Sequence, residues 1–221
     1  MKLRSLLSIP NLISLLRIVL IPLFLYLIFT PTWTHRLWAL AVFVFASFTD
    51  FLDGWLARKL KQESEMGKFL DPLADKILVI AALVAFLILD PLVPLWMVIV
   101  IVGRDVLITL MRYLAIKKGE TLRTSHFGKI KTAFQMISII VVIMVFVVRR
   151  AGIQYYATDD IIKLNRVYQI YMSSDPDKWL IIAPYLLMAV VTIMTALSGF
   201  RYIMTNWRLF LPPYLKGKSA P

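Results

Sequence analysis

Long apolar segments alternate with short polar ones along this chain, and the pattern predicts a bundle of membrane-spanning helices. A membrane helix needs about 20 predominantly apolar residues, and we expect six such spans. They cover residues 12–29, 37–56, 69–89, 92–115, 130–148 and 180–203. A short amphipathic segment, residues 1–10, precedes the first span. The sequence therefore predicts an all-α, polytopic membrane protein with a single domain over residues 1–221.

The composition supports a membrane protein. Hydrophobic residues make up 60% of the chain, compared with roughly 45–50% in soluble domains. There is no cysteine, which excludes disulfides and thiolate metal sites. The first apolar run has no small-residue cleavage site, so we expect no cleavable signal peptide. Nucleic acid is not an expected partner of so apolar a chain. The bland interpretation of the net charge of +12 is that it sets the membrane orientation and contacts anionic lipid headgroups.

The distribution of basic residues predicts the orientation of the six spans. With an even number of spans, the two termini and alternate connections lie on one side of the membrane. The basic residues on that side are Lys2, Arg4, Arg58, Lys59, Lys61, Lys117, Lys118, Arg123, Lys129, Lys131, Arg208, Lys216 and Lys218. Because basic segments stay in the cytoplasm, we expect this side to be cytoplasmic.

Four aspartates interrupt the apolar pattern in the second and third spans. Asp50 and Asp53 are three residues apart, and Asp71 and Asp75 are four apart, so each pair shares a helix face. The polar segment 59–66 returns the chain, and at about 1.5 Å per residue both pairs reach a similar depth near the cytoplasmic face. Carboxylates are expensive in a bilayer and mark functional sites. Oxygen ligands suit Mg²⁺ or Mn²⁺, and two such ions would form a clamp for phosphoryl displacement.

Each aspartate pair also has a structural interpretation. Asp71, followed by Pro72, has the pattern of a helix N-cap with proline at the first helical position. The earlier pair has Arg58 and Lys76 as possible ion-pair partners. The metal interpretation is favoured because both pairs occur together, with small residues at fixed intervals between them.

Two small residues, Gly54 and Ala57, lie beside the first aspartate pair. In a functional interpretation they let a ligand approach the helix backbone closely. In a structural one they allow two membrane helices to cross closely. The sequence leaves both interpretations open.

The spacing of these residues resembles the signature of the CDP-alcohol phosphatidyltransferase family. The pattern D-x2-DG-x2-AR-x8-G-x3-D-x3-D is filled at every position from Asp50 to Asp75. The resemblance implies a six-helix membrane fold, usually a homodimer, which transfers a phosphatidyl group from CDP-diacylglycerol to an alcohol and releases CMP. It implies that the last aspartate, Asp75, is the general base. The residues it implies for CDP-diacylglycerol binding are Asn11, Ser14, Asp53, Gly54, Ala57, Arg58 and Ser64.

Further segments resemble a bacterial branch of this family that uses glycerol 3-phosphate as acceptor. These segments are residues 10–22, 67–76 and 128–135, with Ser198-Gly199 near the end. The resemblance implies an enzyme of the inner cell membrane. Asp105 departs from the branch, which has glutamate after Arg104, and the outer loop 149–178 is longer than expected. Because the first departure brings the chain closer to cardiolipin synthases, phosphatidylglycerol stays open as acceptor, as does inositol phosphate.

Basic residues between the fourth and fifth spans independently favour a phosphorylated acceptor, because arginine can clamp a phosphate bidentately. The positive-inside excess also accounts for exposed cations in this turn. It does not account for Arg104, which lies within an apolar run where a charge needs a reason. Asp105 is a candidate partner for it. The residues predicted to bind the acceptor phosphate are Arg104, Arg112, Ser125, Lys129 and Lys131.

Two other classes of function compete with a transferase. Carboxylates within a membrane also mark ion pathways, so an ion-coupled transporter is the main alternative. A transport site more often lies at the midplane between internal repeats, and no repeat is visible in this chain. A structural or assembly protein has no use for four clustered acids.

Overall fold

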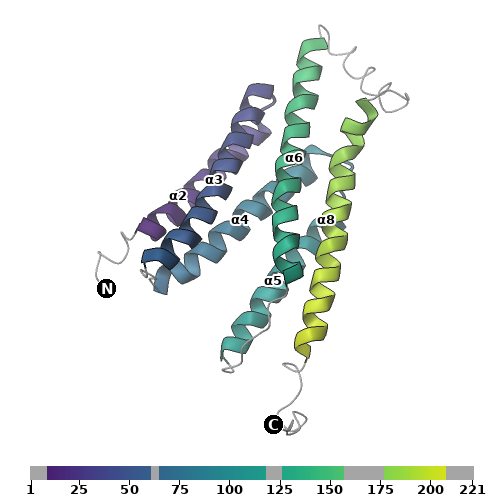
Figure 1. Ribbon diagram of the computed structural model, residues 1–221. Coiled ribbons are helices and arrows are strands. Elements are labelled where there is room, and N and C mark those ends of the chain that lie inside the picture. The colour runs from purple at the N-terminus through teal and green to yellow at the C-terminus, as the bar shows by residue number, and fades with distance from the viewer. Residues whose placement is uncertain (1–8, 61–64, 118–125, 157–176, 208–221) are drawn as a thin grey trace. The chain divides into compact units, whose positions relative to one another are not determined.

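All regular secondary structure is helical in the part of the chain that the computed structural model describes, residues 9–60, 65–117, 126–156 and 177–207. In chain order the helices are α2 (Ile9–Phe29), α3 (Trp33–Leu60), α4 (Glu65–Leu89), α5 (Leu95–Lys117), α6 (His126–Tyr156) and α8 (Asp177–Asn206) (Figure 1). Each predicted span corresponds to one of these helices. The all-α prediction is therefore confirmed.

Among the described residues, two segments are long and apolar enough to cross a membrane, Ile130–Gly152 in α6 and Trp179–Asn206 in α8. Two shorter apolar stretches, Leu15–Phe29 and Lys76–Leu89, lie in α2 and α4. These findings agree with a membrane protein. The arrangement with six spans stays a prediction.

The chain divides into two compact units, each formed by two segments. The first unit consists of Met1–Val93 and Met136–Leu187, and the second of Pro94–Gln135 and Met188–Pro221. The prediction of a single domain over the whole chain is not tested by this division.

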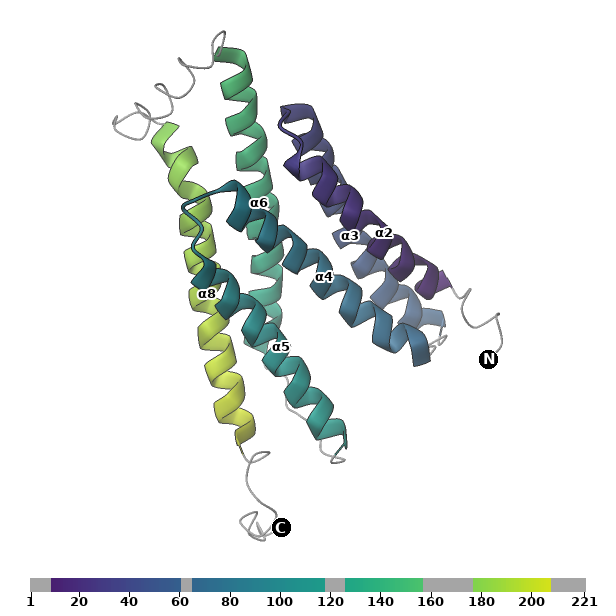
Figure 2. The same cartoon turned by 180° about the vertical axis from the view of Figure 1, so that it is seen from behind.

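Within the first unit, α2 packs against both α3 and α4, and α3 also contacts α4. Buried aromatic rings hold this group together. Phe24 of α2 lies against Phe43 of α3 with ring centroids 5.6 Å apart. The start of α2, the end of α3 and the start of α4 lie at the same end of the group (Figures 1 and 2). This end carries the residues of the predicted site.

Arg149 joins three helices at another point of the first unit. Its Nη1 donates to Asp90 Oδ2 at 2.7 Å, just after α4, and its Nε donates to the carbonyl of Leu180 in α8 at 2.9 Å. Asp90 is almost completely buried, with 1% of its side chain exposed. A buried carboxylate needs a partner of this kind. Arg149 therefore ties the ends of α4, α6 and α8 together.

In the second unit, α5 runs beside the last turns of α8 (Figure 2). Ile108 and Met111 of α5 form a buried apolar cluster with Tyr202 of α8, and Ile203 packs against it. Ile108 and Met111 follow Arg104 along α5 by one and two helical turns. The cluster therefore packs α5 against α8 on the C-terminal side of Arg104.

Candidate functional site

The four aspartates lie on two helices of the same unit that contact each other. Asp50 and Asp53 belong to α3, and Asp71 and Asp75 belong to α4. Each helix is continuous through its pair, so the backbone keeps the two members of a pair on one helix face. The side chains of all four lie outside the described residues, so metal ligation and the ion pairs of Asp50 and Asp53 stay predictions.

The helix-cap interpretation of Asp71 is wrong. It required a helix that starts at Asp71, with Pro72 in the first turn. Instead α4 begins at Glu65 and continues through both residues. A helix whose first turn lies earlier has no use for a cap at Asp71, because only the first four N–H groups of a helix lack partners. One of the structural explanations for this pair is thereby removed.

The positions predicted to bind CDP-diacylglycerol also lie in this helix group. Asn11 and Ser14 are near the start of α2, whereas Gly54, Ala57 and Arg58 are near the end of α3. Those two ends lie together in both views (Figures 1 and 2). The backbone thus gathers them at one end of the group, although their side chains and Ser64 lie outside the described residues.

Arg17 of α2 is a further candidate functional residue, which the sequence analysis included only within the segment 10–22. It is buried, with 1% of the residue exposed. A buried guanidinium is strongly unfavourable unless it has a partner. The signal that identified Arg104, a charge inside an apolar run, applies equally to Arg17.

The donor set of the aspartate quartet fits hard divalent cations. Carboxylate oxygens are the ligands that Mg²⁺ and Mn²⁺ prefer, and α3 and α4 bring four of them into one helix group. No group of three or more potential metal ligands occurs among the side chains that the structure describes. The four aspartates are outside that set, so they remain the candidate for metal binding.

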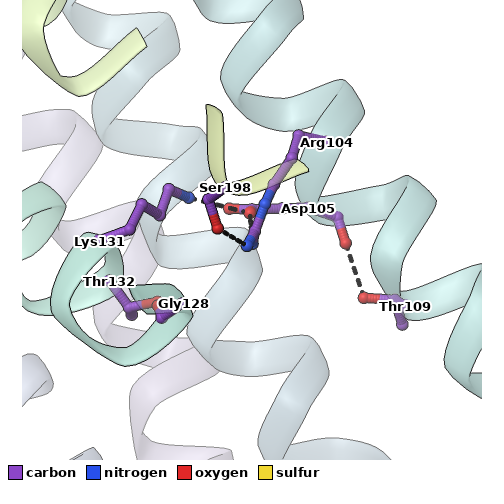
Figure 3. A network of polar contacts seen from close by, with 7 residues as sticks. All are labelled: Arg104, Asp105, Thr109, Gly128, Lys131, Thr132 and Ser198. Atoms are coloured by element: carbon purple, nitrogen blue, oxygen red, sulfur yellow. Dashed lines mark hydrogen bonds and ion pairs between the residues drawn. The ribbon is translucent and has the colours of Figure 1, made fainter. Parts of the chain in front are cut away.

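A second candidate site is a polar network in the other unit, formed by Arg104 and Asp105 of α5, Lys131 of α6 and Ser198 of α8 (Figure 3). Asp105 Oδ1 accepts from Arg104 Nη1 at 2.9 Å and from Lys131 Nζ at 3.0 Å. Arg104 Nη2 donates to Ser198 Oγ at 2.7 Å. The predicted pairing of Arg104 with Asp105 is confirmed.

The network combines two cations with one carboxylate and is largely shielded from solvent. The exposed fractions of the side chains are 1% for Lys131, 15% for Arg104 and 25% for Asp105. Arg104 Nε is buried without an acceptor in the described part of the chain. A net positive charge with spare donors in a shielded site is suited to an anion with several oxygens, such as a phosphate.

The network brings together two of the five residues predicted to bind the acceptor phosphate, Arg104 and Lys131. Arg112 is exposed on α5 and is not part of it; eight residues of helix separate it from Arg104, or about 12 Å along the axis. Lys129 lies at the start of α6, but its side chain is not described. Ser125 lies outside the described residues.

Gly199 contributes to the network through the space that it leaves. A Cβ atom at this position would lie 2.9 Å from Arg104 Cγ, closer than real Cβ contacts. The glycine therefore lets the stem of Arg104 lie against the backbone of α8. Sequence reasoning missed this role, since it noted Ser198-Gly199 only as part of a resemblance.

Buried polar side chains continue along α8 on both sides of Ser198. They are Thr192, Thr195, Ser198, Tyr202 and Asn206. Their spacing of three or four residues places them on one helix face. The Thr195 and Tyr202 hydroxyls and Gln135 Nε2 of α6 have no hydrogen-bond partner in the described part of the chain. The second unit therefore has a polar seam that an apolar span would not need.

Comparison with known proteins identifies the family. The family model described as CDP-alcohol phosphatidyltransferase matches residues 7–158. The chain is 42% identical over 144 residues to the CDP-diacylglycerol–glycerol-3-phosphate 3-phosphatidyltransferase of Bacillus subtilis (strain 168), covering 60% of this chain and 74% of that protein. It is 40% identical over 143 residues to the Pseudomonas fluorescens protein of the same name, covering 62% and 72%.

A third relative of the same name, from Yersinia enterocolitica, is 31% identical over 213 residues. This match covers 94% of the chain and 99% of the relative. The likeness thus extends through α8, beyond the segment that the family model matches. The chain belongs to the CDP-alcohol phosphatidyltransferase family.

Proposed function

We propose that this protein transfers the phosphatidyl group of CDP-diacylglycerol to glycerol 3-phosphate, giving phosphatidylglycerol phosphate and CMP in phospholipid synthesis. The observation that carries the proposal is the match over 94% of the chain to a relative named for this reaction. The complete aspartate signature from Asp50 to Asp75 supports it. The family assignment also argues against an ion-coupled transporter.

In the proposed reaction, a hydroxyl oxygen of the acceptor attacks the lipid-bearing phosphorus. The new bond joins that oxygen to phosphorus, and the bond from phosphorus to the bridging oxygen of the diphosphate breaks. CMP leaves with the bridging oxygen, and Asp75 accepts the proton of the attacking hydroxyl. Phosphoryl transfer depends mainly on positioning and charge neutralisation, which a site of carboxylates and cations is suited to provide.

Asp50, Asp53, Asp71 and Asp75 would hold two divalent cations. When bound, the ions supply the positive charge that neutralises the diphosphate and stabilises CMP as a leaving group. Gly54 and Ala57 would admit the nucleotide to the backbone of α3, with Asn11, Ser14, Arg58 and Ser64 holding the CDP headgroup.

The acceptor phosphate would bind to Arg104 and Lys131. Contributions from Arg112, Ser125 and Lys129 stay predictions from the sequence, because Arg112 lies outside the network and the other two side chains are not described. Among the described residues, the network around Arg104 has two cations and one carboxylate, which leaves a charge of +1 for the phosphate dianion. Lys131 is buried, so its ammonium acts where water screens it little. A phosphate ester gains more from such a site than a neutral alcohol does.

The proposed enzyme has six membrane spans, a cytoplasmic active site in the inner cell membrane and a homodimeric assembly. The family resemblance supports the spans and the dimer. The basic segments that follow the second, fourth and sixth spans support the orientation.

The test is to incubate the purified protein with CDP-diacylglycerol, Mg²⁺ and one acceptor at a time, and to follow CMP release. Glycerol 3-phosphate should support release, and glycerol should be a poor acceptor because it lacks the phosphate. Preference for inositol phosphate or phosphatidylglycerol would reassign the acceptor. Absence of CMP release with every acceptor would overturn the proposed function.

A further inference from the structure

We infer that Asp105, Ser198 and Gly199 are positioning residues, which hold the guanidinium of Arg104 and the ammonium of Lys131 in place for the acceptor phosphate (Figure 3). The inference rests on the acceptor site proposed above. None of the three residues needs to touch the substrate for this role.

Asp105 restrains both cations through one oxygen atom. Arg104 and Asp105 are neighbours in sequence, and adjacent residues of a helix point in different directions. Arg104 must therefore fold back to reach Asp105 Oδ1 at 2.9 Å. The same oxygen accepts from Lys131, which is 26 residues away on α6. Without this carboxylate the two cations would repel each other, and buried Lys131 would lose its opposite charge.

Gly199 and Ser198 restrain Arg104 from the side of α8. The missing Cβ of Gly199 makes room for the Arg104 stem, which approaches to 2.9 Å of the position that a Cβ would take. Ser198 Oγ then accepts from Nη2, while Nη1 is held by Asp105. Arginine loses considerable side-chain freedom when it binds a ligand. A guanidinium fixed beforehand on two sides loses less of it.

Removing the charge of Asp105 allows a test in which positioning and simple electrostatics predict opposite changes in the KM for glycerol 3-phosphate. Asp105→Asn removes one negative charge, which raises the net charge of the described network residues from +1 to +2. If charge alone controlled phosphate affinity, the KM for glycerol 3-phosphate would fall. Positioning instead predicts a rise of roughly tenfold, from the loss of charge-assisted hydrogen bonds. Asp105→Glu keeps the charge and should restore part of the affinity.

Two glycines that differ in their surroundings provide a matched pair of substitutions. Gly199→Ala places a methyl group where the Arg104 stem lies. Gly103 is the residue before Arg104, and a methyl group at this position would have no atom within 4 Å apart from its own helix backbone and chain neighbours. Both changes replace glycine by alanine within a helix, so their effects on helix propensity are similar. Gly199→Ala should raise the KM for glycerol 3-phosphate roughly tenfold, and Gly103→Ala should leave it near the wild-type value.

The measurement is steady-state kinetics with both substrates varied, together with thermal unfolding of each variant in detergent. The KM for CDP-diacylglycerol and the slow rate with glycerol should stay near wild-type values, because neither depends on the acceptor phosphate. A general loss of structure would change both. These two readouts separate positioning from damage to the fold.

Arg104→Met and Lys131→Met separate this inference from the proposed acceptor site. If both variants keep the wild-type KM for glycerol 3-phosphate, the proposed acceptor site is wrong. If both raise the KM while Gly199→Ala behaves like Gly103→Ala, the role of Gly199 is overturned. A lower KM in Asp105→Asn would overturn the role of Asp105. In the last two cases the proposed function stands.

Discussion

Charged residues inside apolar helices have the clearest individual roles in this protein. A charge buried in an apolar helix is unfavourable without a partner, and Arg17 and Lys131 are charges of this kind. Lys131 has its partner in Asp105. The same physical argument applies to Asp75, for which we propose a catalytic role.

Asp75→Asn tests that role. The substitution keeps the size of the side chain but removes its basicity and one negative charge. We expect kcat to fall by at least about 10²-fold, the lower range for losing a general base. The fold should persist, because repulsion among the four carboxylates decreases. The measurement is the rate of CMP release at saturating concentrations of both substrates.

Metal titration separates the loss of a base from the loss of a metal ligand at Asp75. If the residue acted only as a ligand, high concentrations of Mg²⁺ or Mn²⁺ would restore much of the rate. A missing base is not replaced by added metal. Full activity of Asp75→Asn at ordinary metal concentration would assign the base to another residue.

Sequence reasoning reached part of the residue-level picture. It named Asp105 as a candidate partner of Arg104, because a charge inside an apolar run needs a reason. It did not predict that Asp105 also holds Lys131. That contact depends on how α5 packs against α6, which spacing along the chain does not determine. The role of Gly199 was missed for the same reason, since it is defined by a side chain on another helix.

At the level of helices, Pro184 shows how one element depends on another. Proline has no N–H group, so a proline inside a helix leaves the carbonyl four residues earlier without its usual donor. In α8 that carbonyl belongs to Leu180, and Arg149 Nε donates to it at 2.9 Å. Neighbouring helices commonly satisfy backbone groups that a proline frees in a membrane. Arg149 of α6 performs this role here.

A double-mutant cycle between Arg149 and Pro184 tests this account. Arg149→Met removes the donor for Leu180 and the partner of buried Asp90, and we expect it to lower the free energy of unfolding by about 3–5 kcal/mol. In a Pro184→Ala background, the new N–H can bond to the Leu180 carbonyl. The loss caused by Arg149→Met should then be smaller by about 1 kcal/mol.

The free energy of unfolding can be measured by titrating the detergent-solubilised protein with a denaturing detergent. Val148→Ala in the same two backgrounds is a suitable control, because Val148 makes no hydrogen bond through its side chain. Its effect should be the same in the wild-type and Pro184→Ala backgrounds. An equal loss for Arg149→Met in both backgrounds would contradict the proposed link between the arginine and the proline.

In the part of the chain that the structure describes, the number and order of the helices could be predicted from hydropathy, but not all of their ends could. The fifth apolar span covers residues 130–148, whereas α6 runs from His126 to Tyr156. An apolar segment ends where it leaves the hydrocarbon, but the helix continues because its backbone hydrogen bonds are internal. The polar residues on one face of α8 were also missed. The mean hydropathy of the span stays high, because most of its other residues are apolar.

At the level of the whole molecule, the predicted reaction requires one chain to bind a lipid nucleotide, metals and a small phosphate ester. The aspartate signature lies on α3 and α4 of the first unit, whereas Arg104 and Lys131 lie in the second. The proposed metal site and the proposed acceptor site therefore belong to different units. Family resemblance supplied the reaction, because hydropathy and spacing alone predicted only a metal site and an anion site.

Metal dependence is the property that follows most directly from the four aspartates together. Four carboxylates on touching helices would repel one another strongly without cations between them. We expect EDTA to abolish CMP release, and Mg²⁺ or Mn²⁺ to restore it. Full activity in metal-free buffer would contradict the proposed two-metal site.

Thermal unfolding provides a test of metal binding that does not depend on catalysis. A ligand that binds only the folded state raises stability, by about 2.7 kcal/mol at a concentration 100 times its Kd. Mg²⁺ or Mn²⁺ should therefore raise the unfolding temperature of the wild type, and less so in Asp50→Asn and Asp71→Asn. Asp105→Asn is the matched control, because it removes a carboxylate that lies outside the signature and is already paired with two cations. Its response to metal should equal that of the wild type, whereas an equal response in all variants would show that the ions bind elsewhere.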